Sequence, residues 1–362
     1  MSQRLRGGRW MFGSVLSAVL LSACGSHPED ESPVRAEDAA QDGKLSATVS
    51  VPKAALAAGE EVTVRVTLTN DSSHPVKLLK WRVPGAGLMD GRLDITRDGE
   101  PVAYTGAHYK RVAPRPQDYV TLEPGESLSG PVAVSGVYDL SRSGTYRIRF
   151  ELPARAEETV AELDAPEVSL FIEGRPDRRA SQPSPQVTSS SLAFSGGCTP
   201  SQQSTIGAAL STAMNYASVA AGYLSAGPTI PALRYTTWFG IYRPNGWSLA
   251  KNHFARIQTT LSTASLVVDC SCADSGVYAY VYKNQPYNIY TCGAFWNAPT
   301  RGSDSKAGTL IHELSHFTVV ADTDDFAYGH TGATTLALTR PSQALDNADN
   351  HEYFAENTPP IP

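Results

Sequence analysis

The stretch Ser305-Lys-Ala-Gly-Thr-Leu-Ile-His-Glu-Leu-Ser-His-Phe317 has the apolar spacing of a helix and contains two histidines four residues apart. On a helix, His312 and His316 lie one turn apart on the same face, so that both imidazoles can reach one metal ion. Glu313 lies beside the first histidine, where its carboxylate can take a proton from a water molecule at the metal. The stretch therefore predicts a zinc hydrolase whose active site is built on one helix.

A catalytic zinc site needs a third protein ligand and one position that remains open to water. The metzincin spacing requires a histidine six residues after His316, but Asp322 stands there, so this class is excluded. Asp325 is a candidate in the acidic segment that follows, although clustered aspartates are also typical of a solvated turn. Glu352 and Glu356, at 36 and 40 residues past His316, are the competing candidates and would make the site gluzincin-like.

The segment Asp322-Thr-Asp-Asp-Phe-Ala-Tyr-Gly329 resembles the Gly-Thr-x-Asp-x-x-Tyr-Gly motif of the deuterolysin-like aspzincins, a family of zinc metalloproteases. The resemblance implies that Asp325 is the third ligand of one zinc ion, together with the two histidines. It places the tyrosine of the motif on Tyr328, whose hydroxyl we expect to stabilise the oxyanion that develops on the scissile carbonyl. The one departure from the motif is Asp322, which stands where the family has glycine.

Further segments of the C-terminal half extend the resemblance, and they lie at 234–240, 278–282, 292–296, 298–300, 307–309 and 347–354. They are closest to the peptidyl-Lys metalloendopeptidase branch, and the resemblance covers nearly all of 195–362. It implies that Asp349 and Glu352 bind a lysine ammonium in the S1′ pocket, which holds the residue after the scissile bond. It also implies two disulfide bonds, Cys198–Cys270 and Cys272–Cys292.

The spacing of Asp349 and Glu352 is compatible with such a pocket, because residues three apart share one face of a helix. Two neighbouring carboxylates can compensate a desolvated ammonium, which is a compact point charge. The same spacing is also common on solvated helix faces. The two residues by themselves therefore leave both interpretations open.

These features together predict a secreted zinc metalloendopeptidase that hydrolyses proteins on the amino side of lysine, with one zinc ion per catalytic domain. An aspzincin protease of broader specificity is the alternative. A non-catalytic surface lipoprotein with a structural metal is another, but a structural site needs four protein ligands, and no fourth cysteine or histidine stands at a suitable spacing. With 30 basic and 36 acidic residues, the chain lacks the excess of basic residues that nucleic-acid binding through a basic face requires.

The N-terminus has the pattern of a bacterial lipoprotein signal peptide over 1–24. Three arginines precede a short apolar run, and Leu21-Ser-Ala-Cys24 resembles the lipobox, whose cysteine is lipidated. Ordinary signal cleavage near Ala23 is the alternative. Both interpretations predict export, and a lipid on Cys24 would be the chain's connection to a membrane. The other four cysteines are expected to pair in an oxidising compartment.

The 362 residues suffice for two domains, and the pattern of apolar residues differs between the two halves of the sequence. Residues 25–43 are polar and acidic and predict a flexible tether. Over 44–173, alternating strands separated by turn residues predict an all-β immunoglobulin-like sandwich. A segment rich in proline, serine and arginine at 174–194 predicts a linker with a processing site. Residues 195–362 mix helical and strand patterns, which predicts an α+β zincin-like catalytic domain.

No catalytic constellation occurs in the predicted sandwich, so we expect it to be a prodomain. In that role it would act on its own protease as an intramolecular inhibitor or as a folding chaperone, until the linker is cut. Lys110 lies in a polar loop of this domain and could enter the S1′ pocket as a tethered substrate mimic. An ordinary solvated loop lysine is the interpretation that the sequence favours.

Overall fold

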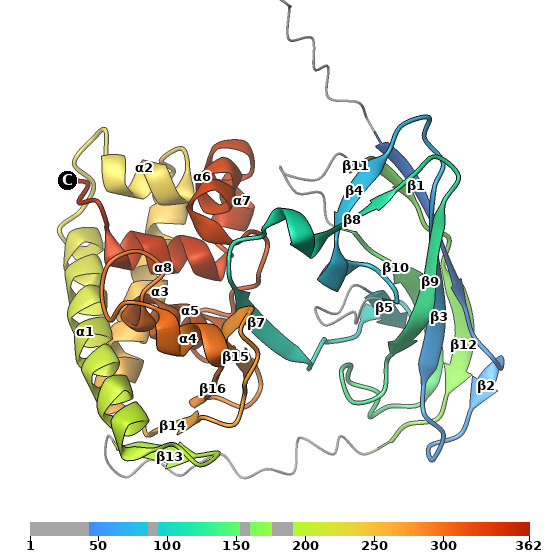
Figure 1. The fold of residues 1–362 in the computed structure, drawn as a ribbon, viewed down its shortest axis with the longest axis horizontal. Coiled ribbons are helices and arrows are strands. Elements are labelled where there is room, and N and C mark those ends of the chain that lie inside the picture. The colour runs from blue at the N-terminus through green and yellow to red at the C-terminus, as the bar shows by residue number, and fades with distance from the viewer. Residues whose placement is uncertain (1–42, 86–92, 153–159, 176–190) are drawn as a thin grey trace, which may run out of the picture. The chain divides into compact units, whose positions relative to one another are not determined.

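The computed structural model describes residues 43–85, 93–152, 160–175 and 191–362. The predicted signal peptide with Cys24, the tether up to residue 42 and most of the predicted linker lie outside these residues. Within them, no helix combines the length and the apolar character that crossing a membrane requires. The described chain has a β-rich N-terminal part and a C-terminal part that contains both helices and strands (Figure 1).

The N-terminal part consists of two β-sheets that share an apolar core. Alternating sequences produce this arrangement, because every second side chain of β10 (Gly144–Phe150) is buried and the intervening ones are exposed. The first sheet contains β11 (Val160–Asp164), β1 (Gly43–Ser50), β3 (Thr63–Asn70) and β9 (Ser127–Ala133). The second contains β2 (Ala55–Leu56), β12 (Val168–Ile172), β10, β5 (Leu93–Arg97) and β6 (Glu100–Pro101), and a separate pair contains β4 (Val76–Leu79) and β8 (Tyr119–Leu122).

Strand β7 (Ala107–Arg111) comes from the N-terminal part of the sequence but belongs to the C-terminal sheet. That sheet has the order β13 (Leu192–Ser195), β14 (Leu266–Asp269), β16 (Asn288–Thr291), β15 (Val277–Tyr282) and β7. Strand β7 lies beside β15 (Figure 1) and runs antiparallel to it. His108 pairs with Val281, and Lys110 pairs with Ala279. The segment predicted as a prodomain loop is therefore the edge strand of the other sheet.

The helices of the C-terminal part pack around one apolar core with this sheet. They are α1 (Pro200–Ser225), α2 (Leu233–Phe239), α3 (Pro244–Thr263), α4 (Gly293–Asn297), α5 (Lys306–His316), α6 (Gly329–Thr339), α7 (Pro341–Ala344) and α8 (Ala348–Glu356). Short 3₁₀ helices cover Lys80–Arg82 and Pro116–Asp118 in the N-terminal half. The disulfides join Cys198 to Cys270 and Cys272 to Cys292, which is the pairing that the resemblance implied.

Helix α5 is buried along its whole length. Ser305 caps its first turn, because the serine hydroxyl accepts a 2.9 Å hydrogen bond from the backbone N–H of Gly308. A side chain at Gly308 would collide with Glu352 and Glu356 of α8, so this glycine allows α8 to pack closely against α5. The close packing brings the acidic residues of α8 next to the histidines of α5.

Candidate active site

The two histidines of α5 and the carboxylate of Asp325 converge on one point. The Nε2 atoms of His312 and His316 are 3.2 Å apart, and they lie 3.3 and 3.4 Å from the two carboxylate oxygens of Asp325. Ligands of a tetrahedral zinc ion, each about 2.0–2.2 Å from the metal, are about 3.3–3.6 Å from one another. The donor types and their separations therefore fit zinc.

Contacts on the far side of each ring orient the histidines. The Nδ1 atom of His316 donates a 2.7 Å hydrogen bond to the backbone carbonyl of Thr323, which leaves Nε2 as the metal-facing nitrogen. The Nδ1 atom of His312 lies 2.8 Å from Asp349 Oδ1 on α8. Burial lowers the pKa of His316 to about 4, so its ring is neutral, which is the form that binds a metal.

The segment that carries Asp325 is held in a specific backbone conformation. Asp322 has a φ of 56°, in the left-handed region that glycine adopts most easily and that aspartate tolerates. This explains why the family motif has glycine at this position and why aspartate can replace it. The carboxylate of Asp324 pairs with Lys283, at 2.7 Å, and lies 3.7 Å from His108. The pKa of Asp325 is held below its usual range by the neighbouring histidines despite burial.

Asn347 connects this segment to α8. Its Oδ1 accepts hydrogen bonds from the backbone N–H groups of Phe326 (2.7 Å) and Ala327 (3.0 Å), and its Nδ2 donates to the carbonyl of Ala327 (3.1 Å). All of these groups are shielded from water to a large extent, and Asn347 itself is fully buried. The side chain therefore fixes the backbone directly after Asp325.

Asn347→Ala is expected to lower the affinity for zinc by about 10- to 100-fold, because the support of a ligand is lost. Two backbone N–H groups lose their acceptor, which also destabilises the fold by about 1–3 kcal/mol for each buried group. Competition with a chromogenic chelator measures the first effect and thermal unfolding the second. Asn297→Ala, at an exposed position of α4, is the control. Equal zinc affinity in Asn347→Ala and the parent would contradict this role.

Glu313 and Tyr328, the two predicted catalytic residues, are both buried. Glu313 follows His312 on α5, it is fully buried, and its carboxylate oxygens have no hydrogen-bond partner among the described residues. Burial raises the pKa of Glu313 to about 8. Tyr328 lies three residues after Asp325, at the N-cap of α6, with 2% of its surface exposed.

Asp349 and Glu352 form a buried acidic pocket that holds a lysine of the same chain. The ammonium of Lys110 on β7 lies 2.6 Å from Glu352 Oε2 and 3.2 Å from Asp349 Oδ1, and all three side chains are fully buried. Burial opposes the charged form of Lys110, but the two carboxylates raise its pKa well above the usual value. The interpretation of Lys110 as a solvated loop lysine is therefore wrong, because β7 pairs with a strand that lies far away in the sequence.

Two further residues line this pocket and were not found from the sequence. Asp304 Oδ1 lies 3.7 Å from the ammonium of Lys110 and accepts a 2.6 Å hydrogen bond from the hydroxyl of Tyr353. The ring of Tyr278 on β15 is 5.0 Å from the same ammonium, a distance suited to a cation–π contact. Their distance from Lys110 in space identifies these residues: Tyr278 lies in a segment that resembles the family, but nothing in the sequence places it or Asp304 at a lysine ammonium.

The competing third ligands lie elsewhere. Glu352 contacts Lys110, as described above. The carboxylate of Glu356 accepts hydrogen bonds from the backbone N–H of Ser305 (2.8 Å) and from its hydroxyl (2.6 Å), so it stabilises the start of α5. Oε2 of Glu352 also lies 3.5 Å from Nδ1 of His312, whereas Asp325 contacts that ring at Nε2, the nitrogen that faces His316.

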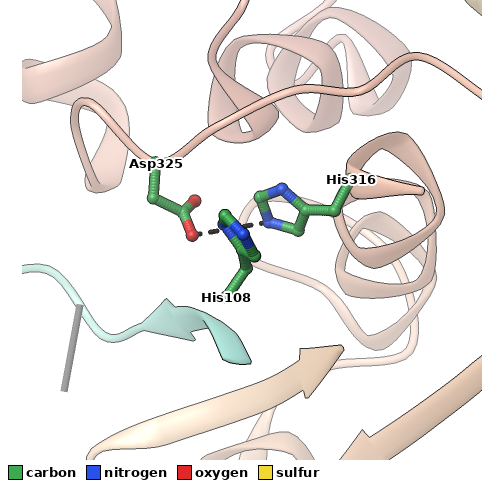
Figure 2. A group of neighbouring side chains, drawn as sticks. All are labelled: His108, His316 and Asp325. Carbon is green, nitrogen blue, oxygen red and sulfur yellow. Dashed lines mark ion pairs between the residues drawn. The ribbon is translucent and has the colours of Figure 1, made fainter. Parts of the chain in front are cut away.

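His108 on β7 is a fourth residue that could bind a metal beside His312, His316 and Asp325, and it was not identified from the sequence. It can offer one ring nitrogen within 4.8 Å of a ligand atom on His316 and on Asp325 (Figure 2). The sequence carries no signal for it until β7 is known to be a strand, in which alternate residues point to the same side. Once Lys110 is placed in the acidic pocket, His108, two residues earlier, must face the same active site.

Known proteins with similar sequences extend this description. The family described as aspzincin, lysine-specific metallo-endopeptidase, matches residues 229–356. An extracellular protease of Aeromonas hydrophila is 46% identical over 83% of this chain and 89% of its own length. A peptidyl-Lys metalloendopeptidase of Armillaria mellea is 35% identical over 83% of this chain and 88% of its own length. A solved structure, a zinc peptidase from Grifola frondosa, is 46% identical and covers 45% of this chain and 99% of its own, with a TM-score of 0.43.

Proposed function

The chain belongs to the aspzincin family of metallo-endopeptidases, and we propose that it cleaves proteins on the amino side of lysine with one zinc ion held by His312, His316 and Asp325. It is a zinc metalloendopeptidase, and the name of the Aeromonas hydrophila relative, an extracellular protease, supports export. The observation that carries the lysine preference is the buried ammonium of Lys110 between Asp349 and Glu352, directly beside His312. A lysine side chain of a substrate would make the same contacts.

In the proposed reaction, Glu313 and Tyr328 have different roles. Zinc, when bound, would polarise a water molecule and the scissile carbonyl. Glu313 would accept the proton of that water on its carboxylate and deliver it to the leaving amine, and a pKa near 8 suits a group that must both accept and release a proton. The hydroxyl of Tyr328 would donate a hydrogen bond to the carbonyl oxygen as negative charge develops on it.

The acidic pocket orients the substrate for this reaction. A lysine ammonium bound by Asp349 and Glu352 loses its water shell, and the two carboxylates replace that hydration. Because Asp349 also contacts His312, the lysine side chain is held next to the metal ligands, so its backbone amide lies at the reacting centre. The bond on the amino side of lysine is then the one presented for hydrolysis.

The proposal extends to the organisation of the chain. Residues 44–173 would be an immunoglobulin-like prodomain, 174–194 a linker that is cut during maturation, and 195–362 the protease. Inhibition by the prodomain is supported by Lys110, which occupies the pocket that a substrate lysine needs. The N-terminal segment 1–24 would direct export as a lipoprotein precursor, with Cys24 as the lipid attachment site.

Digestion of casein by the processed protein tests this function. Mass spectrometry of the fragments is expected to show new N-termini that begin with lysine, and 1,10-phenanthroline should prevent their formation while added zinc restores it. Fragments without a preference for lysine would indicate an aspzincin of broader specificity. A processed, zinc-loaded protein that releases no fragments would contradict the proposal.

A further inference from the structure

Strand β7 holds His108 beside His316 and Asp325, two of the proposed zinc ligands. Its Nε2 atom is buried and has no hydrogen-bond partner among the described residues. Its Nδ1 atom lies 3.7 Å from Asp324 Oδ1, and its ring centroid is 5.1 Å from that of His316. A buried imidazole nitrogen without a partner, among groups that can bind a metal, is costly unless something coordinates it.

The neighbouring contacts of β7 fix the position of this ring. Two residues later, Lys110 is anchored in the acidic pocket at 2.6 Å from Glu352. Tyr109, between them, points to the opposite side and packs against Tyr280 of β15, with ring centroids 5.3 Å apart. Because backbone pairing with β15 and the ion pair of Lys110 hold the strand, the side chain of His108 projects from the face of β7 that is turned toward the site.

We infer that His108 is the fourth protein ligand of the zinc ion in the full-length chain. The inference rests on the proposed zinc site, in which His312, His316 and Asp325 leave one tetrahedral position for the water that hydrolysis requires. Figure 2 shows the His108 ring close to both His316 and Asp325, on the side from which β7 approaches. An imidazole nitrogen in the fourth position closes the site and excludes that water.

This ligand explains how β7 can resemble a substrate without being cut. Lys110 occupies the lysine pocket, so the peptide bond between Tyr109 and Lys110 is the one that the enzyme should attack. Hydrolysis of that bond would consume one water molecule, leaving a carboxylate on Tyr109 and an amine on Lys110. With His108 in the position of the water, the bond stays intact and the chain stays latent.

The coordination of the metal tests the inference without any catalysis. In the full-length chain with Glu313→Gln, which prevents self-processing, X-ray absorption at the zinc edge is expected to report three histidine ligands. His108→Ala and His108→Phe should each report two, and zinc affinity should fall by about 10- to 100-fold. The phenylalanine keeps the ring volume but has no nitrogen, and His74→Ala, at an exposed position, is the control. Three histidine ligands in both His108 variants would overturn the inference.

A cleavage experiment separates this inference from the proposed function. In the chain that retains Glu313, His108→Ala is expected to be cut between Tyr109 and Lys110, giving a fragment whose N-terminus is Lys110. The double variant His108→Ala with Lys110→Ala should lose this cut. If the protein cleaves casein before lysine while His108→Ala keeps both three histidine ligands and an intact Tyr109–Lys110 bond, the role of His108 is wrong and the proposed function stands. If no variant or processed form cleaves any substrate, the proposed function itself fails.

Discussion

Glu313→Gln is expected to lower kcat/KM for a lysine-containing peptide by about 10²- to 10⁴-fold, the usual contribution of a positioned general base. Glutamine has nearly the same shape as glutamate but cannot accept a proton. Since the two carboxylate oxygens of Glu313 have no partner among the described residues, the substitution removes no hydrogen bond from the fold. The loss should therefore appear in kcat, with the structure and the metal unchanged.

Two measurements distinguish this effect from a damaged site. Metal analysis of the variant should give the same zinc content as the parent, because Glu313 is not a ligand in the proposed site. The midpoint of thermal unfolding should not fall, since glutamine has nearly the same shape and the substitution breaks no hydrogen bond at this fully buried position. A variant that cleaves peptides at close to the parental rate would show that another group accepts the proton.

Glu352→Gln together with Asp349→Asn is expected to remove the preference for lysine. Losing the partners of a buried charge costs about 3–5 kcal/mol, which corresponds to about 10²- to 10⁴-fold in kcat/KM for a lysine substrate. The rate for the same peptide with norleucine, which lacks the charge but has a similar chain, should change much less. The ratio of the two rates is the measurement, because it cancels changes in the catalytic centre that affect both peptides.

The single variants divide this effect between the two acids. Glu352 makes the shorter contact with the ammonium, at 2.6 Å, so Glu352→Gln alone should account for most of the lost preference. Asp349 also contacts His312 and accepts a 2.7 Å hydrogen bond from the backbone N–H of Gly329, so Asp349→Asn should reduce both rates. A double variant that still cleaves lysine over norleucine at the parental ratio would mean that the pocket lies elsewhere.

Helices and strands whose pattern arises from residues close together in the sequence could be predicted from the sequence. The helix that carries His312 and His316 was expected over 305–317 and extends over Lys306–His316. The alternating strands of the N-terminal part were recognisable for the same reason, because a period of two residues is a local property. The resemblance to aspzincins supplied Asp325, which the spacing alone left open.

The parts that depend on long-range pairing could not be predicted. Residues 107–111 lack a clear alternation, and their partner β15 lies about 170 residues later, so nothing local indicates that they form an edge strand. The burial of Lys110 and the position of His108 both follow from that pairing. No fourth cysteine or histidine stands at a spacing suitable for a structural metal site, but His108 reaches the site through the long-range pairing of β7.

The carboxylate of Asp349 contacts His312, a ligand in the proposed zinc site, at 2.8 Å and the buried ammonium of Lys110 at 3.2 Å. One group thus takes part in two binding equilibria, that of the zinc ion and that of the lysine side chain. Such equilibria are thermodynamically linked, and the linkage is reciprocal: the factor by which the metal changes the affinity for a lysine peptide equals the factor by which that peptide changes the affinity for the metal. Recognition of the substrate and retention of the cofactor are therefore one coupled property of this enzyme, and neither can be altered at Asp349 without the other.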